Sequence, residues 1–135
     1  MKNILFSIII VSVLAILTSC EKDEGKLPNI SLKTGGLYIS KDTTLAGGTA
    51  FIIGITSSKA ESKDVLKKFN LSKSVNGAAA TTVYDKDLTG SEGDSYSYDY
   101  TANLGSTSGE ATKYIFTVTN RDGLTNQVFL TISVR

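Results

Sequence analysis

The chain has 135 residues, including 14 Lys and Arg, 13 Asp and Glu, one Cys, and no His or Trp. Without histidine a Ser-His-Asp triad is impossible, and balanced charge provides no positive field to attract nucleic acid. A single cysteine excludes an intramolecular disulfide. We therefore predict a non-enzyme that has no nucleic-acid partner and whose folded part depends on its hydrophobic core.

Residues 1–19 are typical of an export signal. Met1-Lys2 is a short positive head, and residues 4–17 are apolar except for two serines. That run is shorter than the roughly 18 residues that span a bilayer and is in the range of a cleavable signal core. Leu17-Thr18-Ser19-Cys20 resembles the lipoprotein box, which implies that Cys20 is acylated and anchors the chain in a membrane. A buried helix of the mature domain is the alternative.

The segment after Cys20 predicts a tether. Glu21-Lys22-Asp23-Glu24 resembles the export signal that directs Bacteroidetes lipoproteins to the outer face of the outer membrane. An ordinary charged spacer on a periplasm-facing lipoprotein is the alternative. Residues 20–28, which end at the single proline, Pro28, are expected to be flexible.

From residue 29 onward the sequence alternates with the period of two that indicates β-strands. About seven strands are expected, with no amphipathic helix of ten residues or more. They cover residues 30–39 (broken at Gly35-Gly36), 49–57, 68–75, 79–84, 95–101, 111–119 and 124–134. Residues 43–49 and 85–93 are predicted as a turn and a loop. This pattern predicts an all-β, immunoglobulin-like Greek-key β-sandwich over residues 29–135.

Three tyrosines in the fifth predicted segment, residues 95–101, leave two interpretations open. Tyr96, Tyr98 and Tyr100 alternate with Ser97 and Asp99. Facing outward, the rings would form a platform for a sugar or a protein, and facing inward they would be core residues. We expect the inward orientation, because serine and aspartate on the other face are poor core residues.

Several segments resemble a known family. Glu110-Ala-Thr-Lys-Tyr114-Ile-Phe116 is similar to the entry to strand F of immunoglobulin-like domains, with Tyr114 at the tyrosine-corner position and Phe116 in place of the second cysteine. Together with "SVNGAAATTVYD", "YSYDYTAN", "GEATKYIFTVTNRDG" and "LTISV", the signal and the lipoprotein box, it resembles the small immunoglobulin-like lipoproteins of Bacteroidetes. The resemblance implies a surface module for adhesion or glycan handling, which the fold alone does not decide.

Candidate binding residues lie in predicted loops, because loops at one end of a sandwich commonly form its contact surface. They are Asn76 and Gly77; Asp85 and Asp87; and Asn120, Arg121 and Asp122. Asp85 and Asp87, with a glycine at the sixth position, partly match a calcium loop, but a third oxygen ligand and the glutamate at the twelfth position are missing. We therefore predict no metal, no cofactor and no catalytic residue.

The sequence leaves three functions open for this lipid-anchored module: adhesion or protein–protein interaction, glycan binding during polysaccharide capture, and a structural spacer. An exposed aromatic row would favour glycans, and an apolar patch of several hundred Å² would favour a protein partner. Asp42-Thr43-Thr44 is also similar to the O-glycosylation acceptor of Bacteroidetes secreted proteins.

Overall fold

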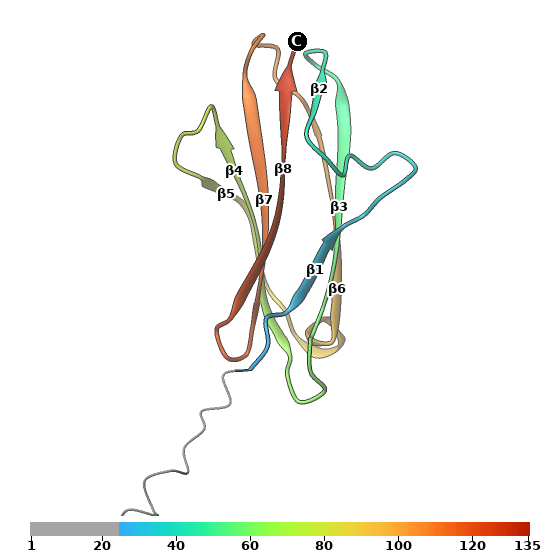
Figure 1. Cartoon of the computed structure of the whole chain (residues 1–135), viewed down its shortest axis with the longest axis vertical. Coiled ribbons are helices and arrows are strands. Elements are labelled where there is room, and N and C mark those ends of the chain that lie inside the picture. The colour runs from blue at the N-terminus through green and yellow to red at the C-terminus, as the bar shows by residue number, and fades with distance from the viewer. Residues whose placement is uncertain (1–24) are drawn as a thin grey trace, which may run out of the picture.

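The structure is a computed structural model that describes residues 25–135, which form two packed β-sheets (Figure 1). The smaller sheet has the strand order β1-β3-β6, and the larger one has the order β2-β8-β7-β4-β5. The strands are β1 (Asn29–Leu32), β2 (Thr43–Leu45), β3 (Ala50–Ser58), β4 (Leu66–Val75), β5 (Thr81–Asp87), β6 (Ser95–Asn103), β7 (Ala111–Asn120) and β8 (Thr125–Val134). The predicted signal peptide, Cys20 and Glu21-Lys22-Asp23-Glu24 lie outside the described residues.

The prediction of an immunoglobulin-like sandwich is confirmed. Strand pairs are antiparallel except that β2 runs parallel to β8. The hairpins β4–β5 and β7–β8 lie in the larger sheet, whereas β3 and β6, which are distant in sequence, pair in the smaller one. Such crossing between two sheets is the Greek-key connectivity of the immunoglobulin fold.

The strand count differs from the sequence prediction at the start of the domain. Thr43–Leu45, predicted as part of a turn, is β2, because Asp42 Oδ1 accepts a hydrogen bond from the N–H of Thr131 and aligns this segment with β8. The predicted strand at residues 37–39 forms only an isolated bridge between Tyr38 and Ile52. Gly35 and Gly36, both with positive φ, turn the chain there and prevent a continuous strand.

The loop prediction for residues 85–93 was wrong at its start. β5 continues through Asp87, and its register places Asp85 opposite Asn70 and Asp87 opposite Lys68 of β4. Polar partners on the neighbouring strand therefore stabilise acidic residues in a strand. Only after Leu88 does the chain leave the sheet, through the short 3₁₀ turn Gly90–Gly93.

The core lies between the sheets and consists of alternate residues from strands of both. Phe69 of β4 is fully buried and contacts four aromatic rings, with centroid distances of 6.2 Å to Tyr84, 5.2 Å to Tyr96, 5.0 Å to Tyr98 and 6.4 Å to Phe116. Phe116, the residue in place of the second cysteine, is also fully buried. Aromatic packing thus fills the region that a disulfide and a tryptophan occupy in antibody domains.

The inward orientation of the three tyrosines is confirmed. Tyr96, Tyr98 and Tyr100 are partly buried and pack against the core, and Tyr84 of β5 stacks on Tyr98 with a centroid distance of 4.8 Å. Ser97, between them, is exposed. The tyrosines therefore do not form an exposed aromatic row.

Candidate functional site

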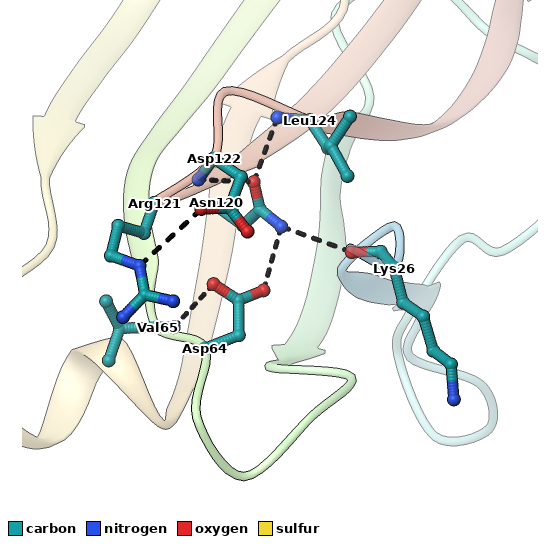
Figure 2. Close-up of polar contacts among 7 residues, drawn as sticks. All are labelled: Lys26, Asp64, Val65, Asn120, Arg121, Asp122 and Leu124. Carbon is teal, nitrogen blue, oxygen red and sulfur yellow. Dashed lines mark hydrogen bonds and ion pairs between the residues drawn. The ribbon is translucent and has the colours of Figure 1, made fainter. Parts of the chain in front are cut away.

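Asn120, predicted as a loop residue that could bind a ligand, is instead a buried structural residue (Figure 2). Its side-chain Nδ2 donates to the Lys26 carbonyl at 3.1 Å and to Asp64 Oδ2 at 2.8 Å. Its Oδ1 accepts from the N–H groups of Asp122 at 3.1 Å and Leu124 at 2.9 Å. The prediction for Asn120 was wrong, because its amide is used within the protein to close the turn between β7 and β8.

Arg121 and Asp122 are exposed in that same turn. Their side chains approach each other, with 3.6 Å between Arg121 Nε and Asp122 Oδ1, and the N–H of Arg121 donates to the Val65 carbonyl at 2.9 Å. Asn126 also binds the Pro28 carbonyl at 2.9 Å. The chain therefore enters the sandwich at the end that carries this turn, as Figure 1 also shows.

Asn76 and Gly77 lie at the opposite end, because the register pairs Leu66 with Asn120 but Val75 with Thr112. Both residues have positive φ, 50° and 76°, as the Asn-Gly turn signal predicts. Asn76 Oδ1 accepts from the N–H of Ala111 at 2.9 Å. Asn76 thus stabilises the turn with its side chain, and binding at Asn76 and Gly77 stays a prediction.

Asp85 lies between the two ends, on the outer face of the larger sheet. Its carboxylate accepts from Lys68 Nζ at 3.0 Å and from Asn70 Nδ2 at 3.1 Å. These bonds, first that from Lys68, lower the pKa of Asp85. The predicted binding residues therefore do not gather at one end of the sandwich. Within residues 25–135, no group of three or more Asp, Glu or Cys side chains could hold a metal ion.

The outer face of the larger sheet carries an exposed aromatic residue that the sequence analysis did not identify. Phe129 on β8 is 56% exposed, and Lys113 Nζ on β7 lies 3.7 Å from its ring centroid. Ile115, half-buried on β7, is directly opposite Phe129. Beside them, Gln127 Nε2 donates to Thr117 Oγ1 at 2.8 Å. We call Lys113, Ile115, Thr117, Gln127 and Phe129 the Phe129 face.

The Phe129 face has an apolar centre, the ring of Phe129. The ammonium group of Lys113 and the side-chain amide of Gln127 lie beside it. The Lys113 ammonium over the Phe129 ring is a cation–π contact. At the edge of the same sheet face is a shallow depression of about 340 Å³, lined by Asp42, Thr43, Thr44, Thr131 and Ser133. The chemistry available here is recognition through aromatic contact and hydrogen bonds.

A second polar cluster covers the outer face of the smaller sheet. Asp99 on β6 accepts from Lys33 Nζ at 2.6 Å and from the Tyr38 hydroxyl at 3.0 Å. The hydrogen bond from Asp99 raises the pKa of Lys33, although desolvation opposes it. A Cβ at Gly54 would lie 2.6 Å from atoms of all three side chains, so glycine allows this close approach. The charge of Asp99 is therefore compensated on the sheet face.

No protein-family model and no curated protein sequence matches this chain. Among solved structures, the sporulation control protein Spo0M from Bacillus subtilis is similar, with a TM-score of 0.46 and 11% sequence identity. The match covers 82% of this chain and 50% of that one, so the chain spans half the length of Spo0M. Such a match bears on neither ligand nor partner. Among residues 25–135, no helix is long and apolar enough to cross a membrane.

Proposed function

We propose that the chain is a non-catalytic, lipid-anchored recognition module of the cell envelope that binds a protein partner through the Phe129 face. The observation that carries this proposal is Phe129, an aromatic side chain that is 56% exposed on a sheet face. Interface hot spots are enriched in aromatic residues that a ring of polar contacts shields from water. Lys113, Thr117 and Gln127 supply such polar groups here.

The size of the surface fits a protein partner. Strands β8, β7, β4 and β5, about 4.8 Å apart and up to ten residues long, form a face of roughly 19 Å by 33 Å, or roughly 600 Å². A standard protein–protein interface buries about 800 Å² on each partner. Extension onto one neighbouring loop would be enough to reach that area.

Glycan binding is the second candidate. The hydroxyl and amide groups of Thr117 and Gln127 beside an exposed ring favour it. However, Tyr96, Tyr98 and Tyr100 pack inward, so the aromatic row that would favour extended glycans is not on the surface. A single ring provides fewer stacking positions, and for this reason we favour the protein partner. A spacer role is the third candidate.

The proposed anchor is Cys20, with Glu21-Lys22-Asp23-Glu24 as the signal for display on the outer face of the outer membrane. A periplasm-facing anchor is the alternative. Support comes from the sequence before residue 25 and from the position of Lys26, whose carbonyl Asn120 binds at one end of the sandwich. With the anchor at that end, both sheet faces and the opposite end with Asn76 and Gly77 would remain accessible.

The anchor is tested by metabolic labelling with a palmitate analogue. The wild-type chain should incorporate the label and a Cys20→Ala variant should not. Equal labelling of the two would contradict lipid attachment at Cys20. Digestion of intact cells by an added protease then distinguishes the two orientations, because a surface-exposed chain should be degraded and a periplasm-facing chain should be protected.

The binding face is tested by cross-linking partners on cells that display the full chain. We expect Phe129→Ala to reduce partner capture about thirtyfold or more, as for an interface hot spot. Leu37→Ala is the matched control, because Leu37 is 89% exposed in a loop outside the Phe129 face. Equal loss in both variants would contradict the proposal. Binding to a polysaccharide array that Phe129→Ala abolishes would instead support the glycan candidate.

A further inference from the structure

Strand β6 is a long sheet edge without the usual protection. The edges of the two described sheets are β1, β6, β2 and β5. β1 and β2 have only four and three residues, and β5 has a bulged ladder and three charged residues near its end. β6 has nine residues in unbroken register with β3, and its single charge is Asp99. Natural proteins normally protect such an edge with charge, a bulge or a short strand.

The hydrogen-bond pattern shows which backbone groups of β6 point away from the sheet. The N–H of Leu104 donates to the Thr49 carbonyl at 2.9 Å, and the N–H of Lys59 donates to the Asp94 carbonyl at 3.0 Å. Bonded and non-bonded pairs alternate in an antiparallel ladder, so the even-numbered residues of β6 bond to β3. The odd-numbered residues therefore direct N–H and C=O groups to the open edge. They are Ser95, Ser97, Asp99, Thr101 and Asn103, all exposed.

Asp99, the one charged residue of β6, does not protect the edge from pairing with another strand. Both carboxylate oxygens of Asp99 are engaged on the sheet face, Oδ1 by Lys33 at 2.6 Å and Oδ2 by Tyr38 at 3.0 Å. The remaining outward side chains are hydroxyls and one amide, which can lie beside another strand without charge repulsion. Within the described part of the chain, no strand pairs with β6 on this side.

We propose that β6 pairs antiparallel with β6 of a second copy of this chain, about a two-fold axis at Tyr98. The two smaller sheets then join into one sheet, β1-β3-β6-β6-β3-β1. In this register Ser97 lies opposite Asp99 of the second copy, where its hydroxyl can donate to the carboxylate, and Ser95 lies opposite Thr101. Tyr96 lies opposite Tyr100, so the partly buried rings gain apolar neighbours.

Neighbouring registers are less favourable. An axis at Asp99 would place two carboxylates opposite each other, which is destabilising. An axis at Ser97 would place Thr101 opposite Gly93, which lies in the 3₁₀ turn and not in a strand. The axis at Tyr98 keeps residues 95–101 of both copies paired and avoids both problems. An isologous contact of this kind is the commonest arrangement of homodimers.

The direction of pairing also predicts where the two copies are anchored, on the premise of the proposed lipid anchor at Cys20. Antiparallel strands place the entry ends of the two sandwiches at opposite ends of the pair. Because Asn120 binds the Lys26 carbonyl, the six residue steps from Cys20 to Lys26 reach about 20 Å at most. Ten-residue strands such as β8 are about 33 Å long. If the strands stand upright on the membrane, the two copies belong to facing membranes, and the pair is a homophilic adhesive contact.

The test uses the full chain, matured and lipidated in a bacterial host, and vesicles of phosphatidylethanolamine and phosphatidylglycerol that carry it. We expect a dimer by light scattering in detergent and clustering between two differently labelled vesicle populations. A monomer under both conditions would overturn the proposal. A dimer without vesicle clustering would overturn the facing-membrane arrangement, provided that flotation shows the chain on the vesicles.

Substitutions at Ser97 test the edge and the register. Ser97→Pro removes an N–H that points away from β3, so the β3–β6 ladder keeps its hydrogen bonds, and dimerisation should fall at least about tenfold. In the proposed register Ser97→Lys faces Asp99 and should strengthen the dimer, whereas Ser97→Glu should weaken it, each by about two- to thirtyfold for the two equivalent contacts. Ser97→Ala is the control. Equal dimerisation of the Lys and Glu variants would overturn the register even if the proline variant unfolds.

Failure of β6 pairing can be distinguished from failure of the proposed function. Partner capture through Phe129 does not require β6, so a Phe129→Ala chain should still dimerise. If no palmitate analogue were incorporated at Cys20, the detergent measurement on the Ser97 variants would still decide whether β6 pairs.

Discussion

Replacing Asn120 with alanine is expected to destabilise the sandwich strongly. The side chain is 2% exposed and makes hydrogen bonds to Lys26, Asp64, Asp122 and Leu124. Asp64 is also 2% exposed, so the substitution removes an amide donor from a buried carboxylate. A buried polar group that loses its partner costs about 1–3 kcal/mol. We assign this full cost to the Asp64 carboxylate and to the Lys26 carbonyl. The N–H groups of Asp122 and Leu124 should contribute less, because water can reach them in an exposed turn.

The expected sum is a loss of roughly 3–5 kcal/mol in the free energy of unfolding, a large part of the roughly 5–15 kcal/mol that stabilises a typical domain. Urea unfolding followed by circular dichroism measures this change, and the accompanying fall in Tm should be roughly 12–30 °C. Asn70→Ala is the matched control, because Asn70 donates to Asp85 at 3.1 Å on the exposed sheet face. It should cost about 1 kcal/mol or less. Equal costs for Asn120→Ala and Asn70→Ala would refute the structural role of the buried amide.

Three further predictions follow from burial and charge. Burial raises the pKa of Tyr114 to about 12, so the hydroxyl loses its proton at a lower pH in the unfolded chain than in the folded one. The free energy of unfolding should therefore fall between pH about 10 and about 12. Urea unfolding across that range measures this fall, which should be less steep in Tyr114→Phe. Phe69→Ala should cost about 3–5 kcal/mol through loss of a fully buried ring, whereas the exposed Phe129→Ala should change stability by about 0.5 kcal/mol or less in the same assay. Lys68 lowers the pKa of Asp85, so an NMR titration should place this carboxyl below its usual range and nearer to it in Lys68→Met.

The alternation of residue types predicted the fold because it reports which side of a strand faces the core, whichever strand lies next to it. Tyr96, Tyr98 and Tyr100 could be oriented from their own sequence, since Ser97 and Asp99 on the other face would be costly to bury. Phe116 was placed differently, through its resemblance to the second-cysteine position of immunoglobulin-like domains, and it is fully buried.

Features that depend on a distant partner could not be predicted in this way. Thr43–Leu45 is a strand because it pairs with β8, about 90 residues later in the chain. Asn120 reads as a turn residue, and its burial depends on Asp64, 56 residues earlier. Asp85 reads as a loop residue because its partners, Lys68 and Asn70, lie on another strand. Polar residues are buried or paired according to tertiary neighbours, which a local pattern does not contain.

The exposure of Phe129, unlike these features, could have been inferred from the residues around it in the sequence. Val128, Leu130, Ile132 and Val134 share the inward face of β8, so Phe129 must point outward from the same strand. A large aromatic residue out of phase with its own strand predicts either an exposed contact residue or a second buried layer. The structure selects exposure, at 56%.

The two proposed surfaces lie on different sheets, and this arrangement has a consequence for binding strength. β6 is an edge of the smaller sheet and Phe129 is on the outer face of the larger one, so a β6-paired dimer still exposes one Phe129 face per copy. The two Phe129 faces of one dimer can bind a multivalent partner together, which increases the overall binding strength without any new contact. Ser97→Pro should therefore reduce capture by clustered partners while leaving the affinity for a monovalent partner unchanged. Phe129→Ala should reduce capture of clustered and of monovalent partners about thirtyfold or more and leave vesicle clustering intact. Any other combination would show that the two surfaces are not independent.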